Sequence, residues 1–262
     1  MKEKNVVIFD LDGTIIENNR LLDKRIAEKI NELEKEDNKV IFATSRSLRG
    51  IKSVLPCNLW KNTLILCNGA FVMDKGKVIL SNYVDEKECV MLISYLCNRQ
   101  VQFYGELGKA LYVPGYVTHD LMNCILDEAQ EEMVYSDYKE IQSRVYKLAI
   151  MENLREAEFR KMSKALRTLK LYCHSDGSFD IVGQGVSKWE AFSKLCIRSQ
   201  YKKVIAFGND RNDIDMLYNA DIGVAVCTED EKVLEVSDKR IYSFMPNAII
   251  DTLNDIINSI ET

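Results

Sequence analysis

The sequence is short of proline and histidine, and it contains no long apolar run. Three prolines among 262 residues, with 47% hydrophobic and 29% charged residues, exclude a collagen-like or disordered chain. No segment approaches the roughly 18 uncharged apolar residues that a membrane span requires. The opening residues MKEKN lead into a short apolar run that ends at Asp10, which is not the pattern of a signal peptide. We therefore expect a globular protein of one large or two modest domains with no membrane partner.

Clustered positive charge is also absent. The chain has 35 Lys and Arg against 40 Asp and Glu, a formal net charge of -5, and the two signs are interspersed. Proteins that bind nucleic acid usually gather Lys and Arg against the phosphate backbone. We therefore predict no nucleic-acid partner, whereas a small anionic substrate is compatible with this charge.

Cysteines and histidines at metal-ligand spacing are missing as well. None of the eight cysteines forms a C-x-x-C pair, and most lie in apolar runs, as buried free thiols do. His119 and His174 have no Cys, His or acidic partner at ligand spacing, so we predict a structural or surface role for both. Reduced cysteines of this kind are typical of a cytoplasmic protein, which is the location we predict.

What the chain does contain is a series of short apolar segments separated by amphipathic helices. Residues 22–33 carry apolar side chains at steps of four, four and three, which predicts a helix between the first two segments. Strand, helix and strand in this order indicate a parallel crossover unit. We predict an α/β fold with a doubly wound, Rossmann-like parallel sheet, whose strands are Val6–Phe9, Lys39–Ala43, Thr63–Cys67, Val204–Phe207 and Ile222–Val226.

The pattern changes after the third strand. Phe71–Met73 and Val78–Leu80 flank residues 74–77, which predicts a hairpin with a four-residue loop. Beyond it, helical and strand-like segments continue without the apolar-to-polar step that ends the buried strands. We predict a Rossmann-like core of residues 1–80 and 184–262 with an inserted α+β cap domain of residues 81–183. Its candidate helices are 85–98, 118–130 and 154–167, and its candidate strands are 102–104, 145–151, 170–174 and 179–182.

Polar residues follow four of the buried strands at the point where each strand ends. Ligands of open parallel sheets bind beyond the carboxyl ends of the strands, so we expect these residues to share one crevice. Turn formation accounts for any one of these strand ends alone, but four together favour a site. The residues are Asp10, Asp12, Thr44, Asn68, Asn209, Asp210 and Asp213.

Asp10 and Asp12 indicate a particular chemistry. On an extended chain their carboxylates project to the same side, and in a partly dry cleft they repel each other unless a cation joins them. Mg²⁺, a hard cation that prefers oxygen ligands, suits such a pair. Asp10 could then attack phosphorus as a nucleophile, while Asp12 protonates the leaving oxygen and later takes a proton from water.

Four motifs, in order along the chain, resemble those of the haloacid dehalogenase superfamily of phosphotransferases. They are Asp10-Leu11-Asp12-Gly13-Thr14, Thr44-Ser45-Arg46, Gly185-Val186-Ser187-Lys188 and Gly208-Asn209-Asp210-Arg211-Asn212-Asp213. The long insert and Asn68-Gly69-Ala70 resemble the Cof-like type IIB branch, which consists largely of sugar-phosphate phosphatases. The resemblance implies a Mg²⁺ cofactor and a phosphatase that acts through a phosphorylated Asp10.

The same resemblance implies roles for further residues. Those expected to bind the phosphoryl oxygens, through side chains or backbone N–H groups, are Leu11, Thr44, Ser45, Lys188 and Asn212. Those expected to hold the metal are Asp10, Asp12, Asn209 and Asp213. Residues of the insert that are candidates for substrate selection are Tyr104, Tyr112, His119, Arg144 and Lys147.

Two positions depart from the family pattern. Ser45 stands where Gly is usual, and Asn209 stands where Asp is usual. An amide oxygen can coordinate Mg²⁺ but brings no charge, so we expect weaker metal binding unless Asp210 or Asp213 supplies a carboxylate. We predict a phosphatase acting on a small phosphorylated metabolite. The alternatives are a phosphomutase of the same superfamily and a member that binds a phosphorylated ligand without turnover.

Overall fold

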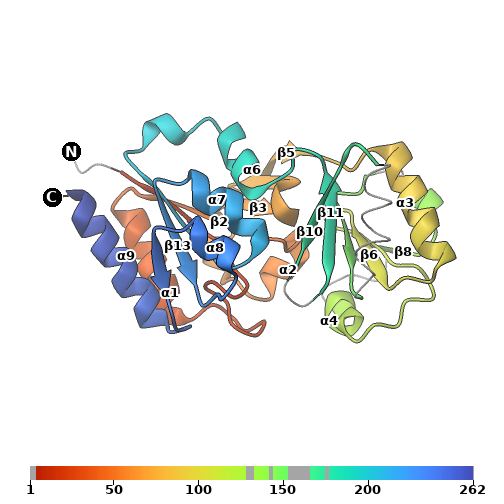
Figure 1. Ribbon diagram of the computed structural model, residues 1–262, viewed down its shortest axis with the longest axis horizontal. Helices are drawn as coiled ribbons and strands as arrows, with labels where there is room; N and C mark the ends of the chain where they lie inside the picture. The colour runs from red at the N-terminus through yellow and green to blue at the C-terminus, as the bar shows by residue number, and fades with distance from the viewer. Residues whose placement is uncertain (1–3, 128–132, 142–143, 153–165, 175–176, 262) are drawn as a thin grey trace.

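The computed structural model has two lobes, each built around its own β-sheet (Figure 1). It describes residues 4–127, 133–141, 144–152, 166–174 and 177–261. The first sheet has eight strands in the order β14-β13-β12-β1-β2-β3-β4-β5, and the second has six in the order β10-β11-β9-β6-β7-β8. The helix predicted at residues 154–167 lies largely outside the described residues.

The first sheet contains the predicted parallel strands. They are β1 (Val6–Phe9), β2 (Lys39–Ala43), β3 (Thr63–Leu66), β12 (Val204–Gly208) and β13 (Ile222–Val226), and β14 (Lys239–Ile241) extends them at one edge. The predicted doubly wound α/β fold is confirmed. The sequence analysis missed β14, because its three residues have no continuous apolar run.

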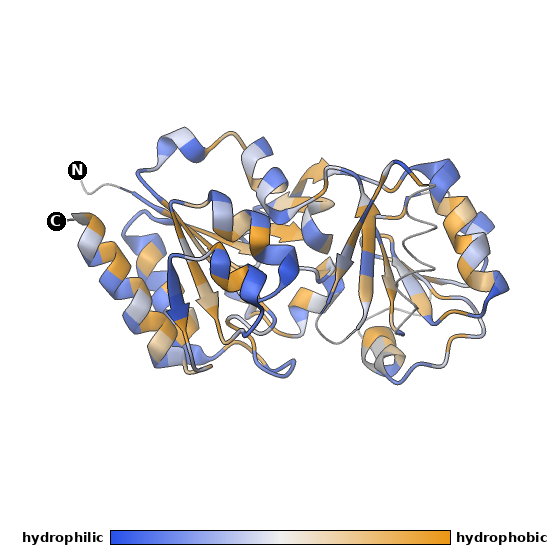
Figure 2. Ribbon diagram, in the orientation of Figure 1, coloured by the Kyte–Doolittle hydropathy of each residue, from blue (hydrophilic) through white to orange (hydrophobic). Residues whose placement is uncertain are grey.

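Helices cover both faces of this sheet because side chains alternate across each strand. Val7 and Phe9 of β1 pack in the same apolar cluster as α1 (Lys24–Lys35) and α9 (Pro246–Glu261). Val6 and Ile8 pack in the opposite cluster, with α6 (Lys188–Lys194), α7 (Ile214–Asn219) and α8 (Glu231–Glu235). In Figure 2 the strands of this lobe are largely hydrophobic, whereas α1 and α9 alternate between hydrophobic and hydrophilic residues.

The hairpin at the other edge of the sheet differs from its prediction. β4 (Phe71–Asp74) pairs antiparallel with β5 (Lys77–Ser81), and Asp74 lies opposite Lys77, so the loop has two residues and the predicted four-residue loop was wrong. Lys75 and Gly76 have φ of 48° and 76°. Positive φ at both tip residues matches the twist of paired strands, which lets the pairing continue further toward the tip.

The second lobe is an antiparallel and mixed sheet covered by a helix. Its strands are β6 (Phe103–Glu106), β7 (Leu111–Tyr112), β8 (Val134–Tyr135), β9 (Lys147–Ile150), β10 (Leu169–Cys173) and β11 (Phe179–Gly183). α3 (Glu86–Asn98) packs on one face against Phe103, Leu148 and Ile181. Side chains at alternate positions, among them Tyr104, Lys147 and Asp180, project to the opposite face. Of the predicted helix at 118–130, the described residues contain α4 (Leu121–Asp127), and residues 128–130 lie outside them.

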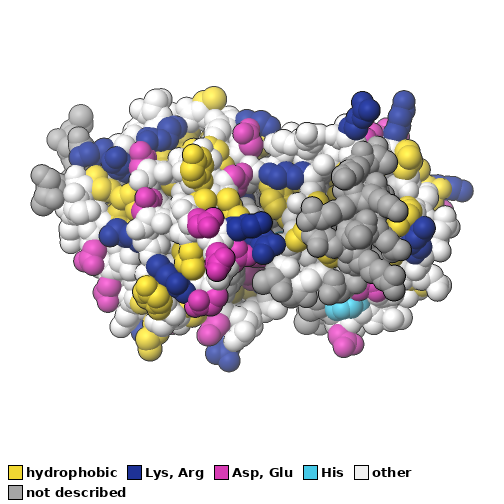
Figure 3. All heavy atoms as spheres, viewed as in Figure 1, with side chains coloured by type: hydrophobic (Ala, Val, Ile, Leu, Met, Phe, Trp, Pro, Cys, Tyr) yellow, Lys and Arg dark blue, Asp and Glu magenta, His cyan; other side chains and the backbone are white. Residues whose placement is uncertain are grey.

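The surface and the helices agree with the composition. On the face seen in Figure 3, acidic and basic side chains intermingle over the first lobe, and neither sign forms a continuous field there. Among the described residues, no helix combines the length and the apolar character that crossing a bilayer requires. The domain boundaries proposed from sequence fall one residue before the end of β5 and at the end of β11.

Candidate active site

A cleft of about 990 Å³ lies between the carboxyl ends of the parallel strands and the second sheet. The residues after the strands that line it are Asp10, Asp12, Ser45, Asn209, Asp210 and Asn212. Thr44 and Asp213 belong to the same segments and Asn68 follows β3, and all three are fully buried, each with no exposed surface. The structure thus brings the strand-end residues together in one region. From the second sheet, Tyr104, Lys147 and Asp180 line the opposite wall.

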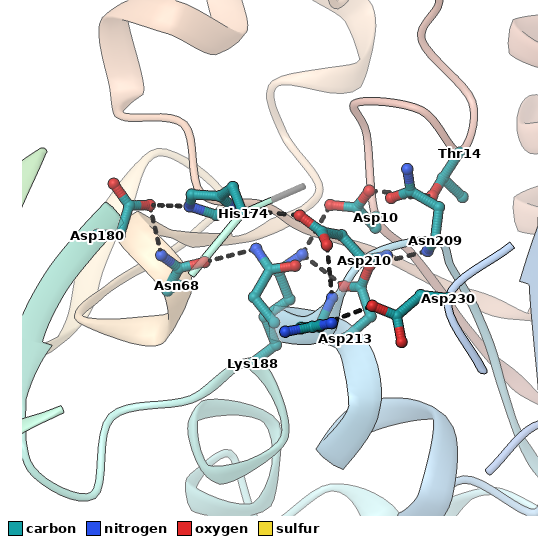
Figure 4. Close-up of polar contacts among 12 residues, drawn as sticks. Asp10, Thr14, Asn68, His174, Asp180, Lys188, Asn209, Asp210, Asp213 and Asp230 are labelled. Atoms are coloured by element: carbon teal, nitrogen blue, oxygen red, sulfur yellow. Dashed lines mark hydrogen bonds and ion pairs between the residues drawn. The ribbon is translucent and has the colours of Figure 1, made fainter. Parts of the chain in front are cut away.

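Lys188 joins two carboxylates beneath the cleft. Its Nζ lies 2.7 Å from Asp10 Oδ1 and 2.6 Å from Asp213 Oδ1, and its side chain has no exposed surface (Figure 4). Lys188 is the first residue of α6, which begins there because the Ser187 side chain accepts a hydrogen bond from Glu190 N–H. The lysine that sequence alone would place in solvent is therefore the buried centre of this group.

The electrostatic balance of this group is one positive charge against two negative charges. Burial and the nearby Asp213 carboxylate raise the pKa of Asp10 to about 7, and Lys188 offsets this only in part. Although burial opposes it, the carboxylates of Asp10 and Asp213 raise the pKa of Lys188 above its usual range. Lys188 therefore remains charged, and a further cation would keep Asp10 ionised.

Asn209 reaches the loop that carries Asp10. The Thr14 hydroxyl lies 3.0 Å from Asp10 Oδ2 and 3.3 Å from Asn209 Oδ1, and it can donate its single hydrogen to either. Gly13 makes this approach possible. It has φ of 74°, and a Cβ there would lie 2.0 Å from Asn209 Nδ2. Asp10 Oδ2 and Asn209 Oδ1 therefore both lie within hydrogen-bond distance of the Thr14 hydroxyl.

Two of the other three acidic candidates for the metal, Asp213 and Asp210, accept hydrogen bonds from nearby groups. Asp213 accepts from Lys188 through Oδ1, and through Oδ2 from the N–H groups of Asn209 and Asp210, at 2.9 and 3.1 Å. Asp210 accepts from Arg211 N–H and contacts His174 Nδ1 at 3.1 Å. Among the described residues, no three His, Cys, Asp or Glu side chains are grouped to hold a metal ion. The Asn209 amide oxygen is a further candidate ligand beside Asp10.

Asp12 lies beside Asp10 at the cleft and is oriented by an arginine. Arg46 donates to it twice, from Nε to Oδ2 at 2.8 Å and from Nη2 to Oδ1 at 2.7 Å. A bidentate pair of this kind restricts the carboxylate to one plane. In this arrangement Asp12 faces the cleft, and a substrate group that binds the Asp12 carboxylate must compete with Arg46 for its oxygens.

The backbone of Thr44–Arg46 turns at the end of β2. The Thr44 hydroxyl accepts from Arg46 N–H at 3.1 Å, which leaves its own hydrogen to be donated to another group. The Thr44 carbonyl accepts from Asn68 N–H at 3.0 Å. Because N–H and C=O of a trans peptide point in opposite directions, Ser45 N–H is directed away from Asn68. The role of the Thr44 hydroxyl and Ser45 N–H as phosphate donors stays a prediction.

Asn68 occupies a sharp turn after β3. It has φ of 58°, and the next residue, Gly69, has φ of 101° and would bring a Cβ to 2.1 Å from the Ser187 carbonyl oxygen. Asn tolerates this left-handed conformation better than most residues. Asn68 Nδ2 donates to Asp180 Oδ2 at 2.8 Å, and Asn68 Oδ1 accepts from Asn212 Nδ2 at 2.9 Å. Asn212 thus lines the cleft but contacts Asn68 and not Lys188.

Asp180 is a site residue that the sequence analysis missed. It accepts from Lys147 Nζ and Asn68 Nδ2 and lies 3.2 Å from His174 Nε2. Despite its burial, these partners hold the pKa of Asp180 well below its usual range. A signal was present, because Asp180 interrupts the apolar strand Phe179–Gly183 and so cannot be an ordinary core residue.

His174 connects the two lobes by bridging carboxylates. It contacts Asp180 of the second sheet and Asp210 of the first lobe (Figure 4). Although burial lowers it, the hydrogen bonds to these two carboxylates raise the pKa of His174 to about 10. The structural role predicted for His174 therefore has a specific form. Its partners are 6 and 36 residues away, so no local spacing could have shown them.

This bridge predicts a pH dependence of stability. The folded pKa of His174 is raised from 6.5 to about 10, so its stabilising contribution is complete below pH 6.5 and is lost as the pH rises through 10. The difference in free energy of unfolding between the wild type and His174→Gln should shrink across this window, by at most about 1.4 kcal/mol per pH unit. Urea unfolding at several pH values measures it, and His119→Gln serves as the matched control. Parallel curves for the wild type and His174→Gln would contradict the bridge.

The residues proposed for substrate selection separate into two groups. Tyr104 and Lys147 line the cleft. Arg49 and Glu106, which form a buried ion pair with Arg49 Nη2 2.5 Å from Glu106 Oε2, also line it. Tyr112 is buried in the core of the second lobe. His119 and Arg144 are not among the residues that line the cleft. Sequence position within the insert did not distinguish these groups, because the distinction depends on which face of the sheet each side chain occupies.

Comparison with known proteins adds independent evidence. Residues 7–253 match the model of a family described as haloacid dehalogenase-like hydrolase. YkrA of Bacillus subtilis (strain 168) is 24% identical over 246 residues, which are 90% of this chain and 91% of that protein. The 5-amino-6-(5-phospho-D-ribitylamino)uracil phosphatase YbjI of Escherichia coli (strain K12) is 19% identical over 261 residues, 96% of each chain. The solved structure of the HAD subclass IIB sugar phosphatase BT4131 superposes with a TM-score of 0.79 at 17% identity, covering 97% of this chain and 99% of its own. The two share a fold.

Proposed function

This chain belongs to the haloacid dehalogenase-like hydrolase family, and on that premise we propose that it is a Mg²⁺-dependent phosphatase of a small phosphorylated metabolite. One observation carries the proposal. The Asp10 carboxylate is held 2.7 Å from Lys188 Nζ at the buried base of a cleft that Asp12 also lines. The names of YbjI and BT4131 describe phosphatases of a phosphorylated ribityl compound and of sugars, and a cleft of about 990 Å³ has room for such a leaving group.

The proposed reaction has two steps. The Asp10 carboxylate attacks phosphorus, the bond to the leaving oxygen breaks, and Asp12 gives that oxygen a proton. Asp12 then takes a proton from a water molecule that attacks the phosphorus of the aspartyl phosphate, which releases phosphate and restores Asp10. In this proposal the phosphoryl oxygens accept hydrogen bonds from Lys188, the Thr44 hydroxyl and Ser45 N–H.

The residues present fit a magnesium ion. Asp10 Oδ2 and Asn209 Oδ1 are hard oxygen ligands that lie within 3.3 Å of the same Thr14 hydroxyl, and the single ammonium group of Lys188 faces the two carboxylates of Asp10 and Asp213. When bound, Mg²⁺ would keep Asp10 ionised and offset the charge on the phosphoryl oxygens. We assign Asp213 the orientation of Lys188 and of the loop that carries Asn209, since it accepts hydrogen bonds from Lys188 Nζ and from the N–H groups of Asn209 and Asp210.

The neutral amide at position 209 predicts weak Mg²⁺ binding, which one substitution should make tighter. Asn209→Asp adds a negative ligand beside Asp10, so the Mg²⁺ concentration at half-maximal activity should fall about tenfold. A Mg²⁺ titration of activity, and of the melting temperature, measures the change. Asn219→Asp adds the same charge at an exposed position on α7 and should leave both titrations unchanged. An unaltered Mg²⁺ requirement in Asn209→Asp would remove Asn209 from the metal site.

The function is tested by phosphate release. The purified protein is supplied with p-nitrophenyl phosphate and a panel of sugar phosphates, with Mg²⁺ or with a chelator. Free phosphate that appears only with Mg²⁺ supports the proposal. An isomerised sugar phosphate would indicate a phosphomutase, and saturable binding without any product would indicate a non-catalytic member. We also propose a cytoplasmic location, supported by the free thiols among the described residues, of which Cys67 and Cys89 are buried and Cys57, Cys196 and Cys227 are exposed.

A further inference from the structure

The turn after β2 is held from the inserted domain. Lys147 Nζ on β9 donates to the Ser45 carbonyl at 2.9 Å, although the two residues are 102 positions apart. Lys147 has only 5% of its surface exposed, so this bond lies in a region from which water is largely removed. A charge-assisted hydrogen bond in such a place is stronger than one at the surface.

Fixing this carbonyl also fixes the group opposite to it. The peptide unit that contains the Ser45 carbonyl carries the N–H of Arg46, which donates to the Thr44 hydroxyl at 3.1 Å. Both ends of this planar unit are therefore engaged, one by the inserted domain and one by Thr44. The orientation of the Thr44 hydroxyl, and so the direction of its hydrogen, depends on where Lys147 holds the peptide.

Asp180 supports the preceding peptide unit in a similar way. It pairs with Lys147 at 3.0 Å and accepts from Asn68 Nδ2 at 2.8 Å. Asn68 N–H in turn holds the Thr44 carbonyl at 3.0 Å, which directs Ser45 N–H to the other side. Two neighbouring residues of the second sheet thus act on two consecutive peptide units of the first lobe.

We infer that Lys147 and Asp180 are positioning residues that orient the Thr44 hydroxyl and Ser45 N–H toward the phosphoryl group. The phosphate-binding turn is complete only while the inserted domain rests on the core, so phosphate binding and domain contact are linked. The inference rests on the proposed function, since it takes this turn to bind a phosphoryl group. A role limited to joining the lobes is already filled by the buried ion pair of Arg49 and Glu106.

Binding of inorganic phosphate tests the inference without requiring turnover. With Mg²⁺ present, calorimetry gives the Kd of orthophosphate, and amide NMR follows Ser45 and Arg46 as phosphate is added. In Lys147→Met the Kd should rise at least about tenfold, and the Ser45 amide should no longer shift. Lys147→Arg keeps the charge and the donors and should recover most of the affinity. Lys170→Met, which removes a lysine from β10 outside the cleft, should bind as the wild type does.

Each outcome decides the question. Wild-type affinity together with a normal Ser45 shift in Lys147→Met would overturn the inference. If the wild type hydrolyses no phosphate ester but its phosphate affinity depends on Lys147, the phosphatase proposal fails and the positioning role stands. A wild type that binds no orthophosphate would overturn both. Should Lys147→Met not fold, Asp180→Asn keeps the lysine and should still weaken binding, and unchanged binding there would overturn the inference.

Discussion

Asp10→Asn should abolish phosphate release, with a loss of at least about 10⁴-fold in kcat. The amide oxygen of asparagine is a poor nucleophile and forms no aspartyl phosphate, while the remaining groups still bind the phosphoryl oxygens. The substrate affinity should therefore change far less than kcat. Steady-state assays with p-nitrophenyl phosphate, together with mass spectrometry of the trapped intermediate, measure both effects. Undiminished turnover in Asp10→Asn would rule out Asp10 as the nucleophile.

The same variant should be as stable as the wild type, or more so, when Mg²⁺ is absent. The pKa of Asp10 is raised to about 7, so the folded state disfavours its ionised form, and the stability it contributes is lost as the pH rises through that value. At about pH 8 a neutral asparagine removes this cost. Thermal unfolding checks this, and Asp251→Asn, at an exposed position on α9, is the matched control for both activity and stability. A much less stable Asp10→Asn would show that lost activity reflects unfolding.

Lys188→Met should impair both stability and activity. Without the ammonium group, the buried carboxylates of Asp10 and Asp213 lose their common partner and repel each other. Breaking a buried pair in this way typically costs about 3–5 kcal/mol in the free energy of unfolding. Activity should fall at least about 10³-fold, because the phosphoryl charge also loses a fixed cation. Urea unfolding and steady-state kinetics measure the two losses.

A double variant separates the two effects. Lys188→Met combined with Asp213→Asn removes one of the repelling carboxylates, so part of the stability should return. Activity should not return, since the cation is still missing. If the double variant were no more stable than Lys188→Met, the repulsion between Asp10 and Asp213 would not be the cause of the instability. If it regained activity, Lys188 would have no direct part in the reaction.

The buried strands were predictable because their signal is local. A strand covered on both faces must be apolar at every position, and Val6–Phe9 and Val204–Gly208 satisfy this without reference to any other segment. Their polar ends were predictable for the same reason, since the change from apolar to polar occurs within two residues. The length of the hairpin loop was not predictable, because lysine has no preference for the positive φ that Lys75 adopts.

The contacts among the site residues needed the tertiary structure. Lys188 lies 178 residues from Asp10 in sequence, and only the family resemblance raised it above an ordinary exposed lysine. Asp213 carried no indication that both of its oxygens would be taken by Lys188 and by backbone N–H groups. For this reason we propose that Asp213 orients Lys188 and the loop of Asn209, while its role as a metal ligand stays a prediction.

By itself, the sequence determined the doubly wound core and the set of acids and amides at the strand ends. These follow from side-chain periodicity and from the order of segments, which are properties of neighbouring residues. Only the tertiary structure decided which wall of the cleft each insert residue occupies, and that Asp180, Lys147 and His174 meet the core there. Burial makes those contacts strong, and burial is decided by the packing of whole sheets against each other, which no short stretch of sequence encodes.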